Sequence, residues 1–122
     1  MKIIIGLRDI TDLVVVDSYK MDSTQLYESF DDGNRVEHRI PISDKVDGQF
    51  EVALSDKNCT IEEFMNLWRE AETNGYVMAT VYVTNRGVMK TINAYYTMTS
   101  KKHERTAKGT YVDVLEIKLE ER

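Results

Sequence analysis

One cysteine stands directly before a predicted helix, which is a place where a thiol can act as a nucleophile. Cys59 precedes the segment that begins at Thr60, and a helix N-terminus can lower the pKa of a thiol because the helix dipole stabilises the thiolate. A cysteine nucleophile also needs a base, and His38 and His103 are the two histidines of the chain. Neither forms a local motif with Cys59. The pattern favours an ordinary cysteine, and a small hydrolase stays open as an alternative.

Acidic residues and glycines form no pattern that binds a metal or a nucleotide. The run Asp31-Asp32-Gly33 lacks the alternating oxygen ligands of a calcium loop. Glu62 and Glu63 begin the predicted helix, where negative charge is favourable in any case. A single cysteine leaves a structural metal site without its usual thiolates, and the glycines are scattered rather than gathered in a phosphate-binding loop. We predict no catalytic residue, no metal and no cofactor.

Positive charge is concentrated in residues 101–110, which read KKHERTAKGT. Four of the sixteen Lys and Arg residues of the chain lie there, and Glu104 is the one acidic residue among them. The chain as a whole has a net charge of −5, which argues against attraction of its entire surface to a phosphate backbone. A local nucleic-acid module stays open as the second function, with exposed tyrosines stacking on bases beside Lys101, Lys102, Arg105 and Lys108.

Length and hydropathy predict one soluble domain. A chain of 122 residues is long enough to bury one core and short for two. The longest apolar runs are far shorter than the roughly 20 residues that cross a bilayer. The N-terminus lacks the apolar segment and cleavage site of a signal peptide, so we expect the protein to stay in the cytoplasm of the cell that makes it.

The pattern of alternating apolar residues predicts about seven or eight strands. Residues 13–21 read as a long strand, residues 22–34 as a loop or hairpin with Asp31-Asp32-Gly33-Asn34 as its turn, and Pro41 marks a sheet edge or bulge. The strongest signal is a hairpin that reverses at Asn85-Arg86-Gly87. The predicted strands are residues 2–7, 13–21, 36–42, 49–54, 76–84, 88–99 and 110–119, with residues 100–109 as a loop before the last.

One helix is predicted, over residues 60–74. Thr60 and Glu63 have the spacing of a capping box, and Ile61, Phe64, Leu67, Trp68 and Ala71 form one apolar stripe. Gly75 is placed to end the helix in the left-handed conformation. The fold class is therefore α+β and mainly β: an antiparallel sandwich or barrel in a single domain, residues 1–122, with one flanking helix.

The layout resembles small tail-associated structural proteins of bacteriophages and prophages of Gram-positive hosts. The resemblance lies in the stretches DDGNRVEHRIPI, TIEEFMNLWREA, VYVTNRGVMKTINAYYTM and YVDVLEIKLEER. It implies a non-catalytic virion protein of tail tube, hub or adaptor type, made in the cytoplasm of a bacterial host, whose copies form a ring and contact other virion proteins. A basic protrusion and acidic segments on one chain also favour head-to-tail association. The candidate subunit contacts are Asp31, Asp32, Arg35, Lys101, Lys102, His103, Arg105 and Lys108, and neither nucleic acid nor a membrane is the expected partner.

Overall fold

The structure is a computed structural model that describes residues 1–31, 37–105 and 107–122, with the backbone alone described for residues 25–31 and 37–44. It has eight strands, one short 3₁₀ helix and one α-helix. In chain order these are β1 Ile4–Ile5, β2 Arg8–Asp9, η1 Thr11–Leu13, β3 Lys20–Asp31, β4 Glu37–Ser55, α1 Ile61–Ala71, β5 Glu72–Thr73, β6 Tyr76–Val83, β7 Val88–Arg105 and β8 Tyr111–Glu121.

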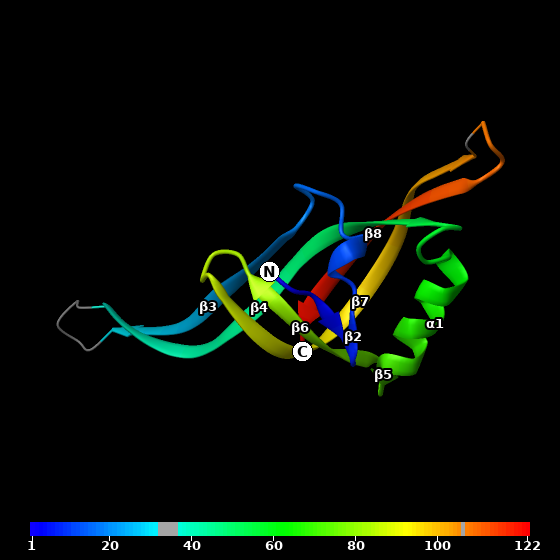
Figure 1. Ribbon diagram of the computed structural model, residues 1–122. Coiled ribbons are helices and arrows are strands. Elements are labelled where there is room, and N and C mark those ends of the chain that lie inside the picture. Colours follow the sequence, from blue (N-terminus) through cyan, green and yellow to red (C-terminus); the bar gives the residue numbers. More distant parts are fainter. Residues whose placement is uncertain (32–36, 106) are drawn as a thin grey trace.

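All eight strands belong to one antiparallel sheet, which confirms the predicted α+β, mainly β class. The strand order is β2-β1-β6-β7-β8-β4-β3, and β5 pairs with β6 outside this path. The sheet curls strongly, and α1 lies beside β7 (Figure 1). Alternate residues of the long strands point inward, so one core forms inside the curl. Its largest buried side chains are Trp68, Phe50, Phe64, Ile3, Ile5, Met21 and Leu54.

At the open side of the curled sheet, two side chains form hydrogen bonds to the backbone of β3, as a neighbouring strand would. Thr84, in the turn after β6, accepts a hydrogen bond from the Met21 amide and donates one to the Met21 carbonyl, each at 2.8 Å. Asn85 does the same with Ser23, at 2.8 and 2.9 Å. The start of β3 is thereby held against the end of β6. We call this contact the seam.

Gly48 lies where β3 passes closest to β4. A Cβ atom at this position would stand 2.0 Å from the backbone oxygen of Lys20 and 2.7 Å from the Cα atom of Met21. Any side chain would therefore collide with backbone, which cannot give way as a flexible side chain can. Glycine is required here for close approach of the two strands.

The helix begins as predicted and ends earlier. Thr60 caps it by accepting a hydrogen bond from the Glu63 amide at 3.2 Å, and Phe64 and Trp68 are buried on its inner side. Trp68 contacts Tyr96 of β7, with ring centroids 4.7 Å apart. The predicted role of Gly75 as the helix stop is wrong. Asn74 and Gly75 both have positive φ and join the paired strands β5 and β6 as a two-residue turn.

Two long hairpins leave the curled body in opposite directions (Figure 1). The β3–β4 arm comprises residues 24–31 and 37–45, and the β7–β8 arm comprises residues 101–105 and 107–112. Of the two readings of residues 22–34, the hairpin is confirmed as far as Asp31 and the loop is wrong there. The separate predicted strands 36–42 and 49–54 are one strand, β4. The bulge predicted at Pro41 is confirmed, because the register shifts between Leu26 and Tyr27, the partner of Pro41.

The predicted strand over residues 13–21 is wrong up to Tyr19, since only Lys20 and Met21 lie in a strand, β3. It is replaced by η1, an isolated bridge between Val14 and Val52, and a left-handed Asp17 before β3 begins. The side chain of Ser18 bonds to the backbone oxygen of Val15 at 2.7 Å, which favours a turn over an extended chain. Within the described residues, no helix has the length and hydropathy needed to cross a membrane.

Candidate assembly surface

The basic stretch lies on a strand rather than in a loop. Residues 101–105 continue β7 and pair with β8, from Lys102 opposite Val114 to Arg105 opposite Tyr111. The predicted loop 100–109 is therefore wrong for its first half. Residues 101–105 are all polar, so this part of β7 lacks the alternating hydropathy that identifies a half-buried strand.

A β-bulge at Lys101 shifts the register of β7 against β8 at the base of the arm. Ser100 is opposite Leu115 and Lys102 is opposite Val114, which leaves Lys101 as the extra residue. The Lys101 ammonium lies 2.8 Å from a Glu51 carboxylate oxygen and 3.6 Å from one of Glu116. The hydrogen bond with Glu51, followed by its charge, raises the pKa of Lys101. This lysine therefore ties β7 to β8 and β4 within one subunit.

The next two residues of the arm also have partners in the same chain. Lys102 forms an ion pair with Glu104 at 3.2 Å. His103 is bonded through Nδ1 to Asp113, and its ring stacks on that of Tyr111 at a centroid distance of 5.3 Å. His103, Tyr111 and Asp113 border an open pocket of about 370 Å³ beside the start of α1. The other residues that line it are Ser55, Asp56, Thr60 and Ile61.

The remaining two cations lie at the tip of the arm. Arg105 and Lys108 are exposed, and neither takes part in an ion pair with another described residue. The tip is therefore the part of KKHERTAKGT whose charge is available to a partner. Asp32 and Arg35 lie outside the described residues, and the side chain of Asp31 does too.

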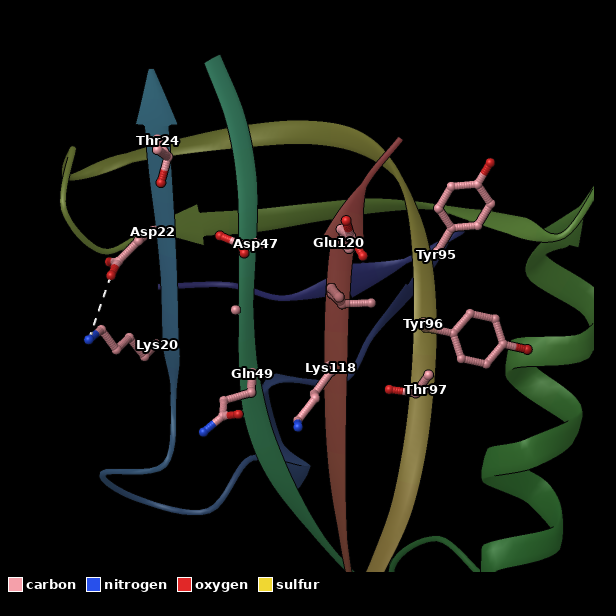
Figure 2. A pocket seen from close by; sticks show the side chains of 12 residues that line it. Lys20, Asp22, Thr24, Asp47, Gln49, Tyr95, Tyr96, Thr97, Lys118 and Glu120 are labelled. Atoms are coloured by element: carbon pink, nitrogen blue, oxygen red, sulfur yellow. Dashed lines mark ion pairs between the residues drawn. The ribbon is translucent and has the colours of Figure 1, made fainter. Parts of the chain in front are cut away.

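A second feature, which the sequence analysis missed, is a hollow on the outer face of β3, β4, β8 and β7. Its volume is about 550 Å³. Figure 2 shows the side chains that line it. Three carboxylates cross it in register: Asp22 is opposite Asp47, and Asp47 is opposite Glu120. We call these three residues the acidic row. Tyr95 continues it on β7, opposite Glu120.

Positive charge near the acidic row neutralises it only in part. Lys20 lies 3.7 Å from Asp22, while Lys118 is directed to Glu116 at 3.8 Å. Asp47 and Glu120 form no ion pair with any described residue. Directly opposed side chains on neighbouring strands have Cβ atoms about 4.5–5.5 Å apart, and like charges at that spacing are destabilising. We therefore expect the acidic row to lower the stability of the isolated subunit.

Tyr95 and Tyr96 point to opposite faces of β7, as predicted. Tyr96 packs on Trp68 and donates a hydrogen bond to Glu72 at 3.2 Å. Tyr95 is 47% exposed and meets Tyr76 edge to face, at a centroid distance of 6.5 Å. Tyr96 therefore packs against the core, and the exposed Tyr95 lies at the border of the hollow.

The surroundings of Cys59 do not favour a thiolate. Partial burial, followed by the nearby charge of Glu63, raises the pKa of Cys59, which is the opposite of what a nucleophile before a helix requires. Of the two histidines, His38 has no described side chain, and His103 is bonded to Asp113. Among the described residues, no group of three or more His, Cys, Asp or Glu side chains is arranged to hold a metal ion.

Comparison with known proteins adds no relative. No family model, no curated protein and no solved structure matches the chain. The arms, the cationic tip and the hollow are the features from which a function can be argued.

Proposed function

We propose that the protein is a non-catalytic structural component of a phage or prophage virion, of tail tube, hub or adaptor type, and that its copies associate through the two arms and their strand edges. The observation that carries this proposal is the pair of hairpin arms that leave the body in opposite directions (Figure 1). A two-stranded hairpin alone is at best marginally stable in water. Long arms outside the core are therefore expected to gain stability from a partner.

The edges of the arms support association by backbone pairing. Among the described strands, β7 pairs with β6 only as far as Ala94, so its second edge is unpaired from Tyr95 onward. β4 pairs with β8 only from Asp47, and the Val46 amide donates to Glu121 at 2.9 Å, so residues 37–45 have an unpaired edge as well. Such edges present rows of N–H and C=O groups that another chain can extend.

The resemblance in layout supports the virion assignment, and the opposite directions of the arms support repeated contacts. A contact between unlike surfaces relates each copy to the next by a rotation. When that rotation closes on itself the copies form a ring, and when it does not they form a filament. The nucleic-acid alternative has weaker support, since Lys101 and Lys102 are already held by carboxylates of the same chain.

The proposal is tested with variants that lack one arm. Residues 25–44 are replaced by Asn-Gly, which joins the paired residues Thr24 and Lys45 through a two-residue turn. Residues 104–112 are replaced in the same way, which joins His103 to Asp113. Light scattering over a wide concentration range, with negative-stain imaging, compares these variants with the wild type. We expect rings or longer assemblies for the wild type and weaker association for both variants.

Retained folding of each variant is checked through Trp68, the one tryptophan of the chain, whose buried ring reports the core by fluorescence. A wild type that stays monomeric at every concentration, without assemblies in the images, would refute self-association. Assemblies that persist in both arm-deleted variants would place the contact on the body instead.

A further inference from the structure

The cationic tip and the hollow are complementary features of the same molecule. The tip carries Arg105 and Lys108, and the hollow carries the acidic row, of which Asp47 and Glu120 have no ion-pair partner among the described residues. The tip projects away from the body and so cannot neutralise the row of its own subunit (Figure 1). A second copy can supply it.

We propose that the tip of the β7–β8 arm of one copy docks in the hollow of the next copy, with Arg105 and Lys108 beside the acidic row. This inference rests on the proposed self-association and names the contact. The hollow is open, and side chains of four strands line it (Figure 2). A projecting hairpin turn is the kind of element that such a depression accepts.

The energetics of the row favour this occupant. Three in-register carboxylates repel one another in the free subunit, so a cation placed among them gains attraction and removes that repulsion. Arginine is suited to the role because its planar guanidinium can bond two carboxylate oxygens at once. Tyr95, half exposed at the end of the row, offers an aromatic face or a hydroxyl to the same turn.

The contact joins unlike surfaces, so every copy has one tip to give and one hollow to fill. Repetition builds a ring or an open chain in which all copies face the same way. Charge complementarity of this kind also raises the association rate and makes it sensitive to salt.

A charge-swap experiment tests the pairing. One variant reverses the tip, Arg105→Glu/Lys108→Glu, and the other reverses the row, Asp47→Lys/Glu120→Lys. Each alone should associate roughly tenfold or more weakly than the wild type, because like charges then meet at the contact. An equimolar mixture should recover association, since the acidic tip of the first fits the basic row of the second. The control Asp12→Lys/Glu70→Lys changes two exposed carboxylates outside the hollow and should associate as the wild type does.

The outcomes separate this contact from self-association in general. If the row variant assembles like the wild type, the hollow is not the contact, although self-association stands. If both variants are weakened and the mixture is not restored, tip and row do not meet each other. A monomeric wild type removes the proposed function and this contact together.

A milder pair guards against misfolding of the row variant. Asp47→Asn/Glu120→Gln keeps the shape of both side chains and removes their charge. It should raise the melting temperature of the monomer, because the repulsion is relieved, and at the same time weaken association. Unchanged association in this variant would overturn the proposal, whatever happens to the melting temperature.

Discussion

The Lys101 ammonium on β7 reaches across β8 to Glu51 on β4, at a distance of 2.8 Å. One side chain thus connects three neighbouring strands at the base of the β7–β8 arm. The residue that begins the most basic stretch of the sequence is therefore committed to its own subunit, and a test of binding by that stretch must leave it in place.

Replacing Lys101 by methionine should lower the melting temperature at neutral pH more than Lys102→Met does, because the partner of Lys102 is Glu104 of the same strand. The pKa of Lys101 is raised on folding, so its contribution to stability is present below the pKa of the unfolded chain and is lost as the pH rises through the folded pKa. Thermal melts at neutral and strongly alkaline pH measure both effects. If the difference in melting temperature between wild type and Lys101→Met were the same at alkaline as at neutral pH, this account would be contradicted.

Gly48→Ala should destabilise the subunit by about 3 kcal/mol or more, because the added Cβ atom meets the backbone of Lys20 and Met21. Gly109→Ala is the matched control: Gly109 has φ of +82° with nothing near its Cβ position, so only conformational strain of about 1 kcal/mol is expected. Urea unfolding followed by Trp68 fluorescence gives both values. Equal losses in the free energy of unfolding for the two variants would show that β3 can move away from β4.

Removing the side chains of the seam should open the curled sheet locally. Thr84→Val and Asn85→Ala each remove a side-chain donor and acceptor that bond to the backbone of β3. Each change should lower the free energy of unfolding by about 1 kcal/mol. Hydrogen exchange of the Met21 and Ser23 amides should become faster in the corresponding variant. Thr80→Val is a control, since the side chain of Thr80 bonds to that of Thr91 and not to the backbone of β3. Protection that survives both seam changes would argue that β3 is held by other contacts.

Cys59 should react slowly with iodoacetamide in the folded protein. Its pKa is raised by burial and by Glu63, so the rate should rise with pH through a midpoint above that of an ordinary thiol, about 8.5. Glu63→Gln removes the second cause and should shift the midpoint downward, while the protein unfolded in urea gives the ordinary reference. Rapid, selective alkylation near neutral pH would instead revive the hydrolase alternative.

The body of the fold follows from local sequence signals that the structure confirms. Three signals depend on neighbours in the chain: the cap at Thr60, the apolar stripe through Phe64 and Trp68, and the reversal at residues 85–87. The helix begins at the predicted cap, and β6 and β7 pair across the predicted reversal. The Asn74-Gly75 turn was misassigned because a glycine after a helix fits a helix stop and a hairpin turn equally well.

The arms and the hollow could not be predicted in the same way. An arm outside the core needs no apolar face, so residues 101–105 lack the alternation by which strands are recognised. The acidic row depends on register: Asp22, Asp47 and Glu120 are far apart in sequence, and only the pairing of β3 with β4 and of β4 with β8 brings them together. The bulge at Lys101 has no clear signature in a single sequence either.

The opposite directions of the two arms give the subunit a polarity (Figure 1). A linear assembly that repeats one contact between unlike surfaces has two chemically different ends, one with a vacant hollow and one with an unoccupied basic tip. Growth at one end can then be stopped without affecting the other. A terminating protein would need to imitate only the tip or only the hollow, and its net charge would reveal which end it caps.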